Sequence, residues 1–195
     1  VKVHEWGGFS TSQMRADIEA GTYSGWDDPR LPTLAGLRNR GTQASALRNF
    51  WLELGITQKD ISVPLATLYA HNTKVIDDDA PRLTFVRHPA DFTLEGEHPN
   101  SLEIPVHPNH ESMGMRKWNL SDGTIWLESE DLEKMDLRLK EFADVALHDR
   151  HARVESIDRS DKRPIVHWLP SNHATEAMLT GTKDNTVFHV EGQLE

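Results

Sequence analysis

Two glycines and three hydroxyl residues stand close together near the start of the chain, in the stretch Gly-Gly-Phe-Ser-Thr-Ser at residues 7–12. A helix is predicted directly after this stretch, and backbone N–H groups at a helix N-terminus can bind a phosphate. Serine and threonine are also ordinary N-caps, because their side chains accept a hydrogen bond from the first helical turn. The pattern therefore fits both a phosphate-binding loop and a simple helix start.

Histidines form the second candidate site. The chain has 11 of them, and His107 and His110 lie three residues apart in the stretch His-Pro-Asn-His, with His98 and Glu111 nearby. Metal ligands must converge on the ion from one side. Pro108 instead favours an extended loop, so we expect these histidines to lie on the surface of a loop and to bind no metal.

Carboxylates occur as neighbours in sequence, in the pair Asp27–Asp28 and in the run Asp77–Asp79. A general acid and a general base usually come from separate elements that converge on a substrate, whereas adjacent aspartates are typical of turns. The chain has no cysteine, no Gly-x-Ser-x-Gly pattern, no Walker-type phosphate loop and no dinucleotide fingerprint. The lack of cysteine excludes disulfides, thiolate zinc sites and cysteine nucleophiles.

Arginine outnumbers lysine by 13 to 8, and its planar guanidinium suits the recognition of phosphates and bases. Some arginines fall in a predicted helical hairpin near Trp51 and others in predicted strands: Arg38, Arg40 and Arg48 in the hairpin, and Arg82, Arg116, Arg150 and Arg153 in the strands. A nucleic-acid interface requires such side chains to converge on one face, which only a tertiary structure decides.

The net charge of −10 at pH 7 is unevenly distributed. Residues 1–75 contain 8 Lys and Arg against 7 Asp and Glu, whereas residues 76–195 contain 13 against 24. The acidic excess disfavours non-specific binding to nucleic acid. No apolar run approaches the roughly 18 residues of a membrane span, and the first residues do not form a signal peptide. We therefore expect a soluble, cytoplasmic chain that makes no membrane contact.

Helical patterns dominate the first third of the chain. Caps, breakers and apolar spacing predict four helices, over residues 10–21, 32–41, 42–55 and 62–74. Ser10 or Ser12 and then Thr42 are the predicted N-caps, and Pro32 is placed at the first position of the second helix. The apolar residues expected to face inward are Leu31, Leu34 and Leu37, then Ala46, Leu47, Phe50, Trp51 and Leu54, and finally Leu65, Leu68 and Tyr69.

Short strand-like runs bounded by Gly, Pro, Asn and Asp follow residue 78. They lie at residues 82–86, 91–96, 101–107, 124–129, 144–149, 152–158, 164–170, 175–181 and 186–192. Strands of this length and spacing are typical of a β-barrel or sandwich. One helical interruption is predicted over residues 129–144.

Several stretches together resemble a known family. They are residues 9–41, 46–60, 68–82, 106–116 and 166–170. Their order and approximate spacing are similar to those of the archaeal-type glutamyl-tRNA synthetases and of the related glutaminyl-tRNA synthetases. The Gly-Trp-Asp-Asp-Pro-Arg block at residues 25–30 is specific to this group.

The resemblance implies an α+β layout, in which a short helical stem-contact region precedes a predominantly antiparallel β-barrel that binds the anticodon. Residues 1–78 would be the end of the catalytic domain and the stem-contact region, and residues 79–195 the anticodon-binding domain. We expect the C-terminal portion of a glutamate–tRNA ligase, truncated at its own C-terminus and inactive alone. The full-length enzyme would use ATP and Mg²⁺, whereas we expect no catalytic residue, bound cofactor or metal in this portion.

The resemblance also implies roles for particular residues. Phe9, Ser10, Thr11 and Ser12 correspond to a signature loop that stabilises charge on the ATP phosphates, although the lysines of the general class I pattern are absent. The block at residues 26–30 would couple bound tRNA to that loop, or would merely pack as a turn. The residues expected to contact tRNA are Arg38, Arg48, Lys59, Arg82, Arg116, His148 and Arg150.

The implied partner is tRNA(Glu), with tRNA(Gln) as a second possibility, and the implied state is a monomer. A glutaminyl-tRNA synthetase is the near alternative, and a non-catalytic β-barrel interaction module is an alternative of another class. The acidic second part of the chain is unusual for an RNA-binding protein, and it is consistent with a surface adapted to high salt.

Overall fold

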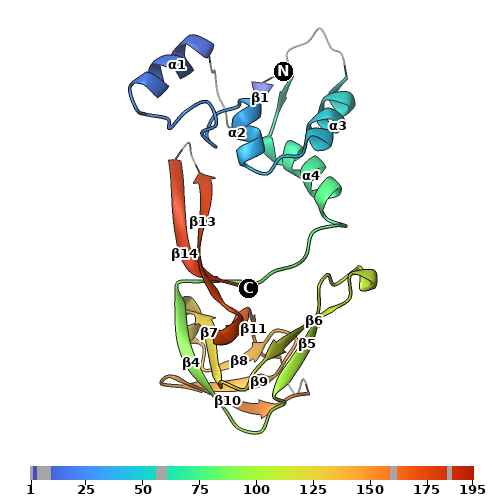
Figure 1. Ribbon diagram of the computed structural model, residues 1–195, viewed down its shortest axis with the longest axis vertical. Coiled ribbons are helices and arrows are strands. Elements are labelled where there is room, and N and C mark those ends of the chain that lie inside the picture. Colours follow the sequence, from blue (N-terminus) through green and yellow to red (C-terminus); the bar gives the residue numbers. More distant parts are fainter. Residues whose placement is uncertain (1, 4–9, 56–60, 159–161, 184–185) are drawn as a thin grey trace. The chain divides into compact units, whose positions relative to one another are not determined.

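The structure is a computed structural model that describes residues 2–3, 10–55, 61–158, 162–183 and 186–195. The chain divides into two compact units (Figure 1). Unit 1 comprises Val1–Ala80 and Gly181–Phe188, and unit 2 comprises Pro81–Thr180 and His189–Glu195. No helix in the described ranges is both long and apolar enough to cross a membrane.

The described part of unit 1 is mainly helical. Its elements are α1 (Thr11–Glu19), α2 (Leu34–Asn39), α3 (Ala44–Leu54), α4 (Leu65–Ile76) and the short parallel pair β1 (Lys2–Val3) and β2 (Ser62–Val63). The four predicted helices are therefore confirmed, although their bounds differ from the predicted ones by a few residues.

The helix starts confirm one predicted cap and correct two other assignments. Ser10 is the N-cap of α1, because its Oγ accepts a main-chain N–H of the first turn at 3.1 Å. The helical position predicted for Pro32 is wrong, since Thr33 is the N-cap of α2 and its hydroxyl accepts an N–H at 2.9 Å. Thr42 is not the cap of α3, where Gln43 occupies that position without a side-chain bond.

A small apolar core holds α2, α3 and α4 together. Its members are Leu37, Phe50, Leu65 and Leu68, with Leu47, Leu54 and Val63 packed against them. Leu34, Trp51 and Tyr69, which were expected to face inward, are instead exposed by 74%, 49% and 39%. In α2, six residues make fewer than two turns, so only the face with Leu37 reaches the core.

Gly36 is predicted to tolerate no side chain. A Cβ added to this residue would lie 2.6 Å from the Leu31 carbonyl oxygen and 2.7 Å from the Asp28 carbonyl oxygen. Because both atoms belong to the main chain, Gly36→Ala should lower the free energy of unfolding by about 1–3 kcal/mol. Ala35→Ser on the exposed side of the same helix should change it by less than about 0.5 kcal/mol. Equal melting temperatures for the two variants would contradict this prediction.

Unit 2 is built on a seven-stranded sheet in the order β11-β8-β9-β10-β4-β7-β12. Its strands are β4 (Pro89–Glu95), β7 (Thr124–Glu128), β8 (Asp136–Leu139), β9 (Asp144–His148), β10 (His151–Ser156), β11 (Ile165–Val166) and β12 (Trp168–Pro170). The pairs β10–β4 and β11–β8 are parallel and the other four are antiparallel.

The two edges of this sheet are consecutive in the chain. β11 and β12 are separated by His167 alone, so the edge strands must lie next to each other and the sheet is nearly closed. The Trp168 Nε1–H donates to the Lys140 carbonyl oxygen at 3.0 Å, and the Lys140 N–H donates to the Val166 carbonyl oxygen at 3.1 Å. These bonds lie beside the seam. The structure therefore confirms an α+β fold with a predominantly antiparallel, barrel-like sheet.

Smaller sheets complete the described strands. β5 (Ser101–Pro105) pairs with β6 (Met115–Asn119), and β3 (Phe85–Arg87) pairs with β14 (Thr186–Leu194), which is followed in the sheet order by β13 (Thr175–Lys183). Short 3-10 turns lie at Glu111–Met113, Ser129–Glu133 and Ser171–His173. β6 is a strand that the sequence analysis did not predict.

The helix predicted over residues 129–144 is wrong. The segment forms a 3-10 turn and then β8, which lies between β9 and β11 in the sheet. Leu137 and Leu139 are both fully buried, two residues apart, which is the spacing of a strand. Arg138, between them, donates to Asp144 at 2.8 Å. Pairing with neighbouring strands therefore overrides the local helical pattern.

The core of unit 2 lies on the inner face of the sheet. Fully buried members include Val86, Phe92, Ile125, Leu127, Val145, Trp168 and Leu169. Phe142 stacks on Trp168 with ring centroids 5.1 Å apart, and Trp118 meets Trp168 edge-on at 5.2 Å. This aromatic group lies beneath the pocket that we regard as the candidate site.

Candidate nucleic-acid interface

The described residues of the predicted ATP loop form a helix start. Ser10 caps α1, and its Oγ lies 3.3 Å from the Ser12 Oγ. Thr11 is the first helical residue, and all three side chains are exposed. Phe9 lies outside the described residues. No cation comes from Ser10, Thr11 or Ser12, so these residues by themselves do not form a complete ATP phosphate site.

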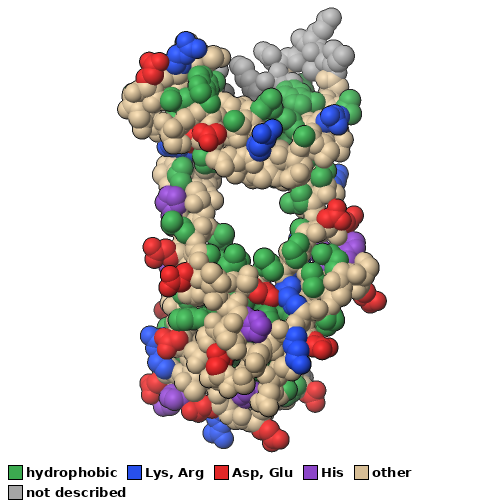
Figure 2. Space-filling view, in the orientation of Figure 1, with side chains coloured by type: hydrophobic (Ala, Val, Ile, Leu, Met, Phe, Trp, Pro, Cys, Tyr) green, Lys and Arg blue, Asp and Glu red, His purple; other side chains and the backbone are tan. Residues whose placement is uncertain are grey.

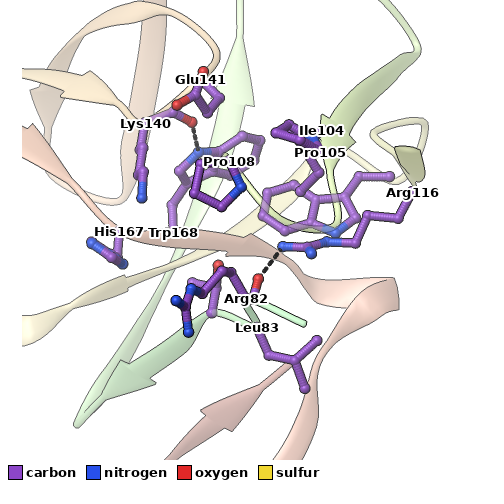
Figure 3. A pocket seen from close by; sticks show the side chains of 12 residues that line it. Arg82, Leu83, Ile104, Pro105, Pro108, Arg116, Lys140, Glu141, His167 and Trp168 are labelled. Carbon is purple, nitrogen blue, oxygen red and sulfur yellow. Dashed lines mark hydrogen bonds between the residues drawn. The ribbon is translucent and has the colours of Figure 1, made fainter. Parts of the chain in front are cut away.

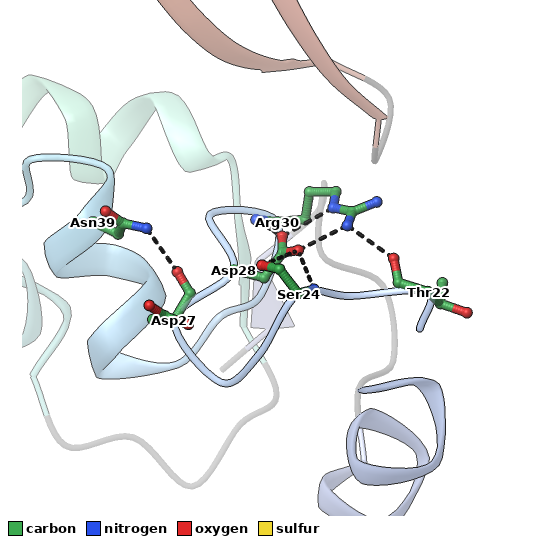
Figure 4. Close-up of polar contacts among 6 residues, drawn as sticks. All are labelled: Thr22, Ser24, Asp27, Asp28, Arg30 and Asn39. Atoms are coloured by element: carbon green, nitrogen blue, oxygen red, sulfur yellow. Dashed lines mark hydrogen bonds and ion pairs between the residues drawn. The ribbon is translucent and has the colours of Figure 1, made fainter. Parts of the chain in front are cut away.

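The block at residues 22–39 is organised around one buried carboxylate (Figure 4). Asp28 is 2% exposed and accepts two hydrogen bonds from the Arg30 guanidinium, at 2.9 and 2.7 Å. It also accepts the Ser24 N–H at 3.0 Å, the Ser24 hydroxyl at 3.1 Å and the Arg30 N–H at 2.9 Å. Because all these donors come from within seven residues, Asp28 fixes the turn locally.

Further contacts extend this network to the neighbouring chain. Arg30 donates to the Thr22 carbonyl oxygen at 2.8 Å and lies over the Tyr23 ring, 4.8 Å from its centroid. The Asn39 side chain donates to the Asp27 carbonyl oxygen at 3.0 Å, which ties the turn to the end of α2. The expectation that adjacent aspartates form a turn is therefore confirmed.

The Asp28 carboxyl is strongly acidic. The hydrogen bond from the Arg30 side chain lowers its pKa well below the ordinary value, and the Ser24 and Arg30 N–H groups lower it further. The same contact raises the pKa of Arg30. The lowered pKa keeps the carboxylate ionised at neutral pH, where it acts as a structural anion rather than as a general base.

Predicted tRNA-contact residues in unit 1 are partly described. Arg38, in the last turn of α2, and Arg48, on α3, are both exposed. Arg40 is half-buried, its guanidinium lies 5.2 Å from the Tyr69 ring centroid, and burial lowers its pKa. Lys59 lies outside the described residues. The RNA-binding roles of Arg38, Arg48 and Lys59 stay predictions.

A pocket of about 320 Å³ opens on unit 2 beside the seam of the sheet (Figure 3). Its lining residues come from the chain before β3, from β5 and β6, from the loop after β8 and from the β11–β12 junction: Arg82, Leu83, Thr84, Ile104, Pro105, Pro108, Arg116, Trp118, Lys140, Glu141, His167 and Trp168. The walls are apolar and aromatic, whereas Arg82, Lys140, His167 and the acid Glu141 are exposed polar residues. Such a combination suits a flat ring attached to an anion.

The pocket brings together two predicted site residues, Arg82 and Arg116, with different surroundings. Arg82 is exposed, and its N–H donates to the Val106 carbonyl oxygen at 2.9 Å. Arg116 is largely buried, and its guanidinium forms an ion pair with Glu195 and donates to the Arg82 carbonyl oxygen at 2.6 Å. Arg116 is thus held by the protein itself.

The other two predicted contacts in unit 2, His148 and Arg150, line a second pocket of about 450 Å³ at the β9–β10 turn. Both are exposed. Arg150 pairs with Asp91 at 3.4 Å, and its guanidinium lies 5.9 Å from the centroid of the Phe92 ring. The structure therefore brings the four predicted residues of unit 2 into two places, and their RNA-binding roles stay predictions.

The surface position expected for the histidine loop is wrong for His107. This residue is 1% exposed, its Nδ1 accepts the Asn109 N–H at 3.1 Å, and its ring lies 4.5 Å from that of His110. The loop closes on itself, because the Val106 N–H donates to the Gly114 carbonyl oxygen at 3.1 Å and the His110 ring packs against that of His107. Among the described residues, no three His, Asp or Glu side chains lie close enough together to hold a metal ion.

Several pocket residues were missed by the sequence analysis. Trp118 lies on the unpredicted strand β6, Lys140 fell in the wrongly predicted helix, and His167 lies at the seam. The alternation of Arg116 and Trp118 with exposed neighbours is a strand signal that could have placed them. Figure 2 shows acidic and basic side chains intermixed on the visible face of unit 2, so the cations there are local groups within an acidic surface.

Comparison with known proteins defines the class of this chain. Residues 80–161 match the family of class I tRNA synthetases (E and Q), anti-codon binding domain. This segment covers most of the nearly closed sheet and much of the pocket wall. Residues 80–161 of this chain therefore belong to the anticodon-binding domain family of the class I tRNA synthetases of the glutamate and glutamine type.

Glutamate–tRNA ligases are among the relatives that are similar to most of this chain. The chain is 41% identical over 182 residues to the glutamate–tRNA ligase of Methanosarcina acetivorans, an alignment that covers 87% of this chain and 32% of that protein. For the glutamate–tRNA ligase of Methanothrix thermoacetophila the identity is 38% over 197 residues (95% and 35%), and for that of Archaeoglobus fulgidus 35% over 192 residues (94% and 34%). The chain spans about a third of the length of these relatives.

Proposed function

We propose that this chain is the tRNA-binding part of a glutamate–tRNA ligase, an enzyme that attaches glutamate to tRNA in an ATP-dependent two-step reaction. The observation that carries the proposal is the coincidence of the anticodon-binding family match, residues 80–161, with the unit that forms a barrel-like sheet beside a pocket with cationic residues. The names of the relatives favour glutamate over glutamine. The reaction itself belongs to the full-length enzyme.

Within this proposal the chain has two parts. Residues 1–78 are the end of the catalytic domain and a stem-contact region, and residues 79–195 bind the anticodon. ATP and Mg²⁺ are used by the full-length enzyme, with cations supplied by residues other than Ser10, Thr11 and Ser12. The turn at Asp28 lies between α1 and α2 and is fixed by several hydrogen bonds. Such a turn suits an element that couples bound tRNA to the loop at residues 9–12.

The pocket of unit 2 is the proposed contact for the anticodon loop. Unpaired RNA bases are commonly splayed out and bound by aromatic and apolar side chains, with cations on the phosphates. Trp118 and Trp168 give this pocket an aromatic wall, and Arg82 and Lys140 are the cations next to it. The partner is tRNA(Glu), with tRNA(Gln) as the alternative, and we propose that the ligase acts as a monomer in the cytoplasm.

Filter binding of labelled tRNA(Glu) at two or more salt concentrations tests the proposal. The wild-type chain should bind weakly, with an affinity that falls as salt rises, because bound cations release counterions from the phosphates. Arg82→Ala should weaken binding and reduce the slope of log affinity against log salt by about 1. Arg153→Ala is the matched control, since Arg153 is exposed on β10 and lines neither pocket that holds a predicted site residue.

Two results would contradict the proposal. The first is a wild-type chain that does not bind tRNA even at low salt. The second is an equal loss of affinity for Arg82→Ala and Arg153→Ala, which would mean that the overall charge, and not the pocket, determines binding.

A further inference from the structure

Glu195, directly after β14, is a largely buried carboxylate that joins β6 to the residue before β3. Its side chain is 9% exposed and forms an ion pair with the Arg116 Nε. The Trp118 Nε1–H donates to its Oε1 at 2.8 Å, and the Thr84 N–H donates to its Oε2 at 3.3 Å. The Glu195 N–H in turn donates to the Thr84 carbonyl oxygen at 3.1 Å. Both oxygens are therefore occupied by groups that line the candidate pocket.

Arg116 links Glu195 to the main chain of Arg82. One of its terminal nitrogens donates to the Arg82 carbonyl oxygen at 2.6 Å and the other to the Val106 carbonyl oxygen at 3.4 Å. The Arg82 N–H donates to the same Val106 oxygen at 2.9 Å. The Arg82 main chain is thus held on both sides, at its N–H and at its carbonyl group, as the dashed bond in Figure 3 illustrates for Arg116.

The contacts between Arg116 and Glu195 leave neither side chain well suited to bind RNA directly. A guanidinium that is bound to a buried carboxylate and two main-chain oxygens has few N–H groups left for a phosphate. Breaking the ion pair to bind RNA would leave the Glu195 carboxylate buried without its cation, which is strongly unfavourable.

We propose that Arg116 and Glu195 form a positioning pair, which fixes the Arg82 main chain at the edge of the pocket so that the Arg82 side chain meets RNA, and that neither member of the pair contacts RNA. This inference rests on the proposed function. According to this inference, the Glu195 carboxylate strengthens RNA binding although its charge repels phosphate. It does so indirectly, because it holds Arg116, which in turn holds Arg82.

The sign of the Glu195→Gln effect tests the pair. Removal of a carboxylate normally strengthens binding to RNA, yet Glu195→Gln should weaken the affinity of the whole chain for an RNA hairpin with the tRNA(Glu) anticodon loop about fivefold to tenfold. A glutamine has a single acceptor oxygen, so it can keep the Trp118 hydrogen bond but not the Thr84 one as well. Thermal melting therefore checks that the variant is folded. Glu103→Gln, an exposed acid on β5, is the matched control and should bind RNA at least as tightly as the wild type.

Arg116→Lys separates positioning from direct contact. A lysine keeps the positive charge but cannot donate to Glu195 and two main-chain oxygens in the same planar arrangement. We expect a loss similar to that of Glu195→Gln, with a salt slope reduced towards that of Arg82→Ala because the affected phosphate contact is the one that Arg82 makes. A direct phosphate contact by Arg116 would instead be largely preserved by lysine. The double variant Arg82→Ala/Glu195→Gln should bind no worse than Arg82→Ala alone, because the pair acts through Arg82.

Each outcome has a distinct meaning once thermal melting shows that the variants are folded at the assay temperature. Wild-type affinity for Glu195→Gln, or additive losses in the double variant, would overturn the positioning pair while the proposed function stands. A wild-type chain that does not bind the hairpin or whole tRNA would overturn the proposed function and the pair with it.

Discussion

Asp28→Ala should lower the free energy of unfolding of unit 1 by about 3–5 kcal/mol, because it leaves the Arg30 guanidinium without its buried partner. The carboxylate also accepts the Ser24 N–H, the Arg30 N–H and the Ser24 hydroxyl, and these groups lose their acceptor at the same time. Urea unfolding, monitored by the hydrogen exchange of unit 1 amides, measures the loss of stability. Amides of Leu31 and Leu37, which are buried beside the turn, should lose most protection.

Asp27→Asn is the matched control for this change. Asp27 is the preceding residue and carries the same charge, but it is exposed and contributes its carbonyl oxygen, not its carboxylate, to the bond with Asn39. The substitution should change the free energy of unfolding by less than about 0.5 kcal/mol. A similar loss in both variants would show that net charge, and not the Asp28 network, stabilises the turn.

The pH dependence of the same group has a definite sign. The folded-state pKa of Asp28 is lowered, so its stabilisation is fully present above the unfolded pKa of about 3.9 and is lost as the pH falls from there towards the folded pKa. Asp28→Asn removes this contribution. The stability difference between wild type and Asp28→Asn should therefore be constant between about pH 5 and about pH 7, because this range lies above the unfolded-state pKa of about 3.9. The difference should shrink at lower pH.

Trp168→Ala should destabilise unit 2 by about 3–5 kcal/mol, since a large side chain that is 1% exposed leaves a cavity. The change also removes the stacking on Phe142, the edge contact with Trp118 and the hydrogen bond to the Lys140 carbonyl oxygen. Because this bond lies beside the seam of the sheet and the indole lines the pocket, a folded fraction should also bind tRNA less tightly. Urea unfolding monitored by circular dichroism measures the loss.

Two further variants make this prediction specific. Trp51→Ala removes the same side chain from an exposed position on α3 and should cost less than about 1 kcal/mol. Trp168→Phe keeps an aromatic ring but no N–H group, and should fall between wild type and Trp168→Ala. A small loss for Trp168→Ala would mean that the aromatic group below the pocket is not part of the stable core.

Local patterns along the chain determined a large part of this structure. Ser10 was identifiable as a cap because a hydroxyl one residue before a helix satisfies an N–H of the first turn. The adjacent aspartates were identifiable as a turn, since the partners of Asp28 lie within four residues of it. The spacing of short runs bounded by Gly, Pro, Asn and Asp indicated a β-barrel or sandwich after residue 78, and the barrel-like form is the one observed. Each of these features depends on neighbours in sequence, and each was therefore readable from it.

Tertiary packing alone decided the rest. Leu137 and Leu139 lie in a strand because β9 and β11 pair with that segment, and His107 is buried where its loop closes on itself and His110 packs against it. The Glu195 contact with Trp118 joins residues 77 positions apart, and no local pattern specifies it. The same holds for Arg116, whose sequence context resembles a surface cation but whose guanidinium is taken by Glu195. Long-range contacts such as these depend on which surfaces the folded strands bring together, so only the structure could distinguish the exposed Arg82 from Arg116, whose guanidinium is paired with Glu195.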